Sequence, residues 1–251
     1  MIEKKGRSGM VKESKIRVAV EESFPAVLRE VFGDNLLSVM LYGSYVSGDF
    51  VPGVSDVNVL VILQNSDTDS IGALGRKAPR MIRKFRITPL ILTRGEFVHS
   101  ADVFPMEYAD IKDRNRVLMG DDEARSLTLE KRNLRHQLEE MLRGSVASLR
   151  QVLIASRGRR RILEANLKVL FGSLKALFKG LLRLQELEEI PSEGVRIVEE
   201  VSRNFRVDGE PFKGLLQLRS GERVDAHKLA SETLASLEQL ITVVDRMKFK
   251  E

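Results

Sequence analysis

Apolar residues in the first half of the chain alternate between helical and strand spacing. Residues 12–31 carry apolar side chains at intervals of three and four, which predicts a helix, and Gly33 is placed to end it. The expected strands cover residues 36–41, 57–63, 87–92 and 117–119, and further helices are expected over residues 70–85 and 105–112. This order of elements indicates a small sheet with helices around it.

Two of the expected strands carry additional information. Residues 57–63 are almost wholly apolar, which indicates a strand buried on both faces. The strand over residues 87–92 contains Pro89, which has no N–H to donate to a sheet. We therefore expect this strand to lie at an edge of the sheet or to contain a bulge.

After residue 122 the pattern becomes wholly helical. The expected helices cover residues 127–156, 161–187, 191–205, 212–218 and 224–247. Amphipathic helices joined by short connections are typical of an antiparallel bundle. The predicted fold class is therefore α+β, with a mixed sheet and flanking helices followed by an all-helical bundle. We place the boundary within residues 120–126, which gives domains of residues 1–123 and 124–251.

The amino-acid composition excludes several classes of protein and of functional site. The chain has 251 residues, of which 43% are hydrophobic and 31% charged, so we expect a globular domain with a substantial core. There is no cysteine, which excludes a disulfide scaffold, a thiolate zinc site and a cysteine nucleophile. The three histidines, His99, His136 and His227, are too far apart in sequence to indicate a histidine-rich metal site.

Charge and hydropathy limit the expected partners. No apolar run approaches the roughly 18 residues of a membrane span, and the polar first residues do not resemble a signal peptide. We therefore expect a cytoplasmic protein with no membrane partner. The net charge of +5 arises after residue 125, because acidic and basic residues balance before it. This excess is small and Trp is absent, so a nucleic-acid partner is disfavoured.

One segment carries the candidate chemistry. The strand expected over residues 36–41 leads into Gly43-Ser44, and a glycine-containing loop then leads to Ser55-Asp56-Val57-Asn58. Gly43 has no side chain, so a phosphate could approach its backbone closely. Ser44 offers a hydroxyl and a backbone N–H, and a short helix beginning there would favour an anion. These features suit a phosphate-binding turn, whereas Gly43-Ser44 taken alone is more typical of an ordinary strand-to-helix turn.

Asp56 and Asn58 are two residues apart, at the start of the second expected strand. Side chains at positions i and i+2 of a strand point to the same face, so both oxygen-bearing groups would lie beside the Gly-Ser turn. Carboxylate and amide oxygens are suitable ligands for a hard cation such as Mg²⁺, which also binds substrate phosphates.

Gly-Ser, a spacer and Ser-Asp-x-Asn between two apolar strands resemble the signature of the polymerase-beta-type nucleotidyltransferase superfamily. The small bacterial branch with the kanamycin nucleotidyltransferases is the most similar in appearance, and residues 104–112 with 116–120 resemble the end of such domains. The resemblance implies that Gly43, Ser44 and Ser55 bind the nucleotide, and that Asp56 and Asn58 are metal-binding and catalytic.

The same resemblance implies the cofactors and partners. Mg²⁺ and ATP or another nucleoside triphosphate are expected, with transfer of a nucleoside monophosphate to a hydroxyl of a small molecule or protein. The acceptor would bind against the helical bundle. A homodimer is also implied, because related proteins often dimerise.

The chain departs from the family pattern in two places. Asn58 stands where the family has a second acid, and residues 86–92 lack the acid that many members carry on the later strand. Glu96, Asp102, Glu107 or Glu164 could supply the missing carboxylate, and spacing does not choose among them. Two hypotheses follow: a Mg²⁺-dependent nucleotidyltransferase, or a degenerate member that binds a nucleotide or partner without catalysis. An arginine occupying the site would favour the second.

Overall fold

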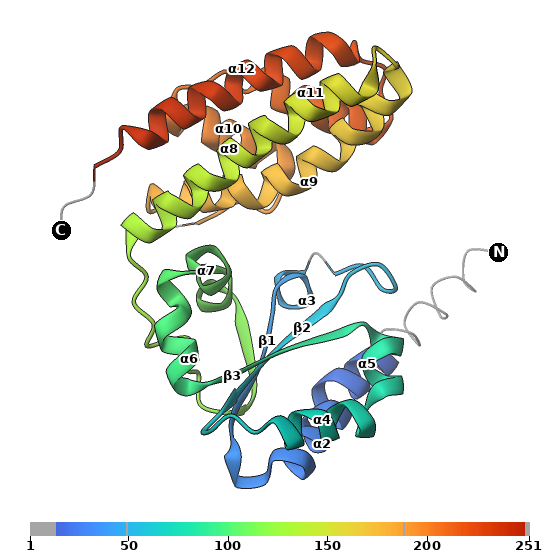
Figure 1. The fold of residues 1–251 in the computed structure, drawn as a ribbon, viewed down its shortest axis with the longest axis vertical. Helices are drawn as coiled ribbons and strands as arrows, with labels where there is room; N and C mark the ends of the chain where they lie inside the picture. Colours follow the sequence, from blue (N-terminus) through green and yellow to red (C-terminus); the bar gives the residue numbers. More distant parts are fainter. Residues whose placement is uncertain (1–13, 49, 188, 249–251) are drawn as a thin grey trace. The chain divides into compact units, whose positions relative to one another are not determined.

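The computed structural model describes residues 14–48, 50–187 and 189–248 (Figure 1). The chain divides into two units, one ending at Leu129 and the other beginning at Glu130. The first unit contains the sheet and the second is helical, which confirms the predicted α+β class. Within the described residues, no helix combines the length and the apolar character that a membrane span requires.

Four strands form one mixed sheet in the order β3-β2-β1-β4. Their bounds are β1 (Leu36–Tyr42), β2 (Val57–Leu63), β3 (Ile87–Thr93) and β4 (Asn115–Gly120). β1 pairs antiparallel with both β2 and β4, whereas β2 and β3 are parallel. β3 lies at an edge, as Pro89 predicted, and the inner strand β2 is buried along nearly its whole length.

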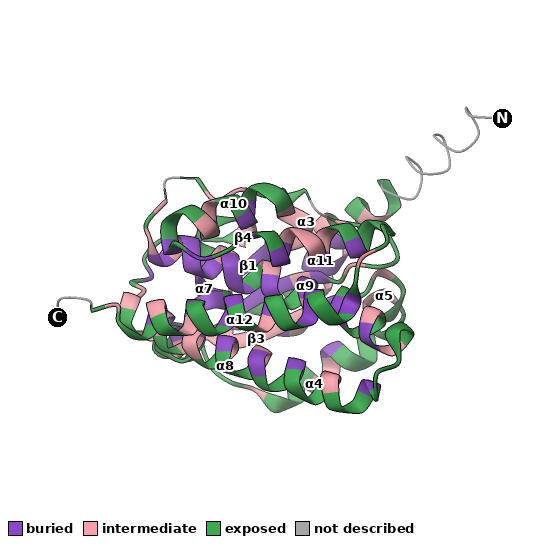
Figure 2. Ribbon diagram, turned by 90° about the horizontal axis from the view of Figure 1, so that it is seen from above, coloured by how far each residue is buried: buried purple, intermediate pink, exposed green. Residues whose placement is uncertain are grey.

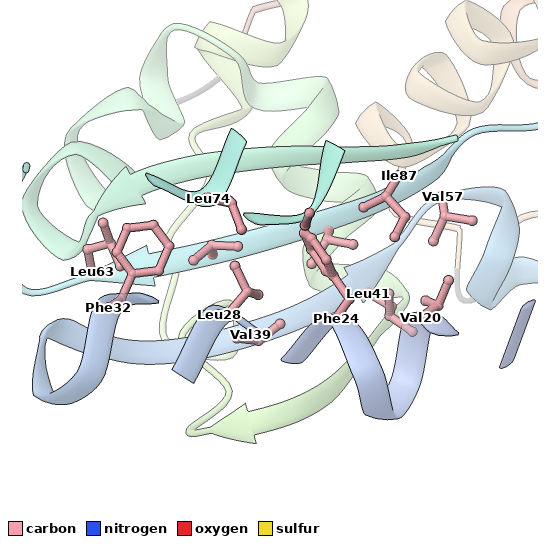
Figure 3. Close-up of a cluster of buried hydrophobic side chains, with 13 residues drawn as sticks. Val20, Phe24, Leu28, Phe32, Val39, Leu41, Val57, Leu63, Leu74 and Ile87 are labelled. Carbon is pink, nitrogen blue, oxygen red and sulfur yellow. The ribbon is translucent and has the colours of Figure 1, made fainter. Parts of the chain in front are cut away.

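Each face of the sheet packs on its own group of helices. Val57, Val59 and Val61 of β2 face a cluster that includes side chains of α2 (Phe24–Phe32) and α4 (Thr68–Lys77). Figure 3 shows this cluster, in which Phe24, Leu28 and Leu74 pack over the strands. Leu60 and Ile62 face the opposite cluster, with side chains of α6 (Arg94–His99) and α7 (Pro105–Asp113). The apolar run over residues 57–63 follows from this two-sided burial.

Local sequence explains where the structure differs from the expected helices. The helix expected over residues 70–85 is two helices, α4 and α5 (Pro79–Phe85), because Pro79 has no N–H to continue α4 and restricts Ala78 before it. The expected helix over residues 12–31 lies partly outside the described residues. Its described part includes a π-helical segment, η1 (Val18–Ser23), before α2.

Helix α6 was not predicted, although a signal for it exists. Thr93 and Glu96 form a capping box, in which the Thr93 hydroxyl accepts from the Glu96 N–H and the Glu96 carboxylate accepts from the Thr93 N–H. This pairing at the end of β3 stabilises a helix start. The short elements that complete the first unit are η2 (Gly33–Asn35), α3 (Ser44–Ser47) and η3 (Ser100–Asp102).

The second unit is an all-helical bundle, as predicted. Its helices are α8 (Lys131–Ser156), α9 (Arg160–Leu184), α10 (Gly194–Phe205), α11 (Glu210–Ser220) and α12 (Ala226–Asp245). Buried and exposed residues alternate along α8 and α12 in Figure 2, as amphipathic helices require. At the core, the rings of Phe178 and Phe212 meet edge to face with centroids 4.8 Å apart.

Candidate functional site

The end of β1 and the starts of β2 and β3 lie along one edge of the sheet, the edge that runs across the strands. The candidate site lies there. Tyr42, the last residue of β1, pairs with Asn58 near the start of β2. Asn58 in turn pairs with Thr88 near the start of the parallel strand β3. This register brings the Gly43-Ser44 turn to the same edge as Asp56 and Asn58, so residues 16 positions apart in sequence, Tyr42 and Asn58, are neighbours in the sheet.

Gly43 adopts a backbone conformation that suits only glycine. Its φ of 73° and ψ of −149° are strained for any residue with a β-carbon. A β-carbon there would lie 2.8 Å from Nδ2 of Asn58, so the Asn58 amide fills the space beside the glycine. The Gly43 carbonyl accepts hydrogen bonds from the N–H groups of Val46 and Ser47, at 3.1 and 3.0 Å, which begins the turn of α3.

The short helix α3, which starts at Ser44, is held from outside the loop. The Tyr45 hydroxyl donates to Glu21 Oε1 at 3.0 Å, and Arg116 of β4 pairs with the same carboxylate oxygen at 2.8 Å. Burial and the hydrogen bond to Glu21 raise the pKa of Tyr45 to about 12. The Tyr45 ring also meets Phe50 edge to face. These contacts fix the backbone on which Ser44 is carried.

Ser55 closes the other end of the loop. Its hydroxyl oxygen accepts from the Val51 N–H at 3.0 Å, and its own N–H donates to the Val51 carbonyl at 2.9 Å. The hydroxyl therefore stabilises a turn just before Asp56. Its predicted role in nucleotide binding stays a prediction.

Asp56 lies one residue before β2, where it forms an ion pair with Arg86, a residue that the sequence did not single out as its partner. Nη2 of Arg86 is 2.8 Å from Asp56 Oδ1, and the two side chains are 47% and 52% exposed. Arg86 follows α5 in the left-handed conformation, with φ of 52°, and its carbonyl accepts from the Val57 N–H at 2.9 Å. The signal was available, since Asp56 and Arg86 each stand one residue before a strand and those strands are parallel.

The residues present do not fit the divalent-cation site that the resemblance implies. Asp56 is paired with a guanidinium, Asn58 offers a neutral amide, and Thr88 occupies the neighbouring position on β3. The described part of the chain contains no group of three or more His, Asp or Glu residues arranged to hold a metal ion. A cation at this edge would have one motif carboxylate as ligand, whereas Mg²⁺ sites usually combine carboxylates with substrate phosphates.

The four acids considered as replacements have different surroundings. Glu96 accepts from Thr93, which caps α6 and lowers the pKa of Glu96. Glu164 pairs with Arg160 on its own helix in the second unit, at 2.6 Å. Asp102 is exposed on η3. Glu107 of α7 is the one that the structure relates to the site, because its charge adds to burial in raising the pKa of Tyr42, the partner of Asn58.

The comparisons with known proteins agree with this fold. The chain is similar to the crystal structure of a spectinomycin adenyltransferase from Enterococcus faecialis with ATP and spectinomycin. The likeness is one of fold, and the fold is nucleotidyltransferase-like. The TM-score is 0.53 at 14% identity, and the match covers 88% of this chain and 96% of the other. No family model and no curated protein matches the sequence.

Proposed function

We propose that this chain binds a nucleoside triphosphate at the edge of the sheet where β1 ends and β2 begins, and that it does so without catalytic turnover. The observation that carries the proposal is the composition of this edge. Gly43 packs against the amide of Asn58, Ser44 follows Gly43, and Asp56, two residues before Asn58, is paired with the guanidinium of Arg86. Hydroxyl, amide and guanidinium groups donate hydrogen bonds, and donors with a positive charge suit the phosphate oxygens of a nucleotide.

The fold supports a nucleotide as the source of those phosphates. The spectinomycin adenyltransferase of the same fold was crystallised with ATP. In this chain the Gly-Ser turn and the Ser-Asp-x-Asn segment occupy the ends of adjacent strands, which is the arrangement that the sequence resemblance implies.

Within the described part of the chain, the lack of free acidic residues at the candidate site supports the absence of turnover. Nucleotidyl transfer in this superfamily relies on carboxylates that hold Mg²⁺, and here Asn58 and Thr88 are neutral while Asp56 is paired with Arg86. An amide oxygen brings no negative charge to balance a divalent cation, so metal affinity falls. The Asp56–Arg86 ion pair is the feature that favours a binding protein over an enzyme.

Nucleotidyl transfer to a hydroxyl of a small molecule or protein, with Mg²⁺, is the second candidate function. One observation favours it: the charge of Glu107 acts on Tyr42, the strand partner of Asn58. Glu107 could then supply the carboxylate that the motif lacks. The spectinomycin adenyltransferase, whose structure includes spectinomycin, makes a hydroxylated small molecule the first acceptor to try.

Calorimetric titration of ATP with Mg²⁺, joined to a pyrophosphate-release assay, tests these proposals. We expect the native chain to bind ATP, and Ser44→Ala to weaken binding about tenfold or more, the value of a hydrogen bond to a charged group. Ser220→Ala, an exposed serine of α11, is the matched control. Pyrophosphate release with any of a panel of hydroxylated acceptors would favour the second candidate, and absence of ATP binding would contradict both.

A further inference from the structure

We propose that the Arg86 guanidinium supplies the positive charge of the phosphate site, at the place where a nucleotidyltransferase would hold a divalent cation. Nucleotide binding by this chain is then independent of metal. The inference rests on the proposed nucleotide site and names the residue that would contact the phosphates. This proposal follows because Asp56, Asn58 and Thr88 do not form a suitable set of ligands for a divalent cation.

The position of Arg86 follows from the parallel pairing of β2 and β3. Val57 pairs with Ile87, so the residues before them, Asp56 and Arg86, meet at the start of the two strands. The Asp56–Arg86 pair lies two residues before the pairing of Asn58 with Thr88. Arg86 therefore contacts Asp56, the carboxylate of the candidate metal-binding motif.

The Arg86 backbone is fixed while its side chain stays accessible. The Arg86 N–H donates to the Ile82 carbonyl at the end of α5, and its carbonyl accepts from Val57 at 2.9 Å. The side chain is 47% exposed, and an exposed ion pair contributes little to stability. Asp56 therefore orients the guanidinium without enclosing it.

The guanidinium has capacity left for a ligand. Arginine carries five N–H donors in a planar fork that matches phosphate oxygens, and Nη2 is the atom engaged by Asp56. Among the residues that the structure describes, Asp56 is the ion-pair partner of Arg86. A phosphate could bind the free edge of the fork while Asp56 keeps the other edge.

The same arrangement disfavours a cation. A divalent ion bound to Asp56 would lie close to the guanidinium, and like charges repel at such distances. Binding the cation would require the Arg86 side chain to leave. Arg86 and a metal ion are therefore alternatives at Asp56, and the structure shows the arginine there.

Titration of ATP into the full chain, once with Mg²⁺ and once with EDTA, tests the inference. We expect the native chain to bind ATP in EDTA, and Arg86→Gly to weaken that binding at least about tenfold, as loss of a charge-assisted hydrogen bond implies. Glycine adopts the left-handed conformation of Arg86 without strain, so this variant should fold. Arg80→Ala, an exposed arginine of α5, removes the same charge and should leave binding unchanged.

The outcomes separate the inference from the proposed function. Native binding that requires Mg²⁺, or equal affinity of native and Arg86→Gly chains in EDTA, would overturn the role of Arg86 alone. Tighter Mg²⁺-dependent binding by Arg86→Gly would show that the arginine only blocks a metal site, and would also overturn it. No ATP binding by the native chain under either condition would overturn the nucleotide site itself.

Discussion

A β-carbon on Gly43 would lie 2.8 Å from the amide nitrogen of Asn58. The turn after β1 and the start of β2 therefore fit together only with glycine at position 43. Gly43→Ala would combine this clash with a φ of 73° and a ψ of −149°. We expect a loss of about 1–3 kcal/mol in the free energy of unfolding and a loss of ATP binding. Urea denaturation and calorimetry measure the two effects.

Gly53→Ala is the control for that variant. Gly53 also has a positive φ, 82°, but a β-carbon there would meet nothing within 4 Å. Gly53→Ala should lower the free energy of unfolding less than Gly43→Ala does, and it should leave ATP binding nearly unchanged. Equal effects of the two variants would show that loop strain, and not the fit against Asn58, explains the result.

Asn58→Asp restores the acid of the family pattern. We expect this variant to bind Mg²⁺ more tightly than the native chain, because a second carboxylate beside Asp56 helps a cation to compete with the Arg86 guanidinium. Calorimetric titration with Mg²⁺ measures the change. Asn166→Asp adds the same charge on an exposed position of α9 and should not alter Mg²⁺ binding. Unchanged affinity of Asn58→Asp would mean that position 58 does not face a cation site.

Tyr45 gives a dependence of stability on pH. Because burial and Glu21 raise its pKa from 10.0 to about 12, the folded state keeps a proton that the unfolded state loses. The contribution of Tyr45 to stability is therefore complete below pH 10 and is lost as the pH rises toward 12. The stability difference between the native chain and Tyr45→Phe should shrink over this range, measured by urea denaturation at each pH. A constant difference would contradict the raised pKa.

The bundle depends on the contact between α9 and α11. Phe178 is fully buried and meets Phe212 edge to face, so Phe178→Ala should destabilise the protein by about 3–5 kcal/mol. Val169 lies on the same helix but is 72% exposed, and Val169→Ala should change stability by less than about 0.5 kcal/mol. Urea denaturation monitored by circular dichroism compares the two variants.

Much of the fold could be predicted because the spacing of apolar residues along the chain reflects which positions are buried. The wholly apolar run over residues 57–63 and the edge position implied by Pro89 are direct consequences of sheet geometry. The break at Ala78-Pro79 and the capping box at Thr93 were missed, although the local signals of proline and of Thr-x-x-Glu were present.

The candidate site was less accessible to sequence reasoning. Gly43, Ser44, Asp56 and Asn58 form a recognisable order along the chain, and their predicted proximity agrees with the pairing of β1 and β2. Arg86 is 30 positions from Asp56, and only the parallel register of β2 and β3 makes them partners. Side-chain partners across a sheet depend on a register that a single sequence does not specify.

NMR spectroscopy can locate a bound nucleotide on the chain. Backbone amide resonances of the isotope-labelled protein would be followed by NMR as ATP is added in EDTA. We expect shifts at residues 43–47, 55–58 and 86–88, where the strand ends meet. Shifts confined to the helical unit, or no shifts at millimolar ATP, would contradict a nucleotide site at this edge of the sheet.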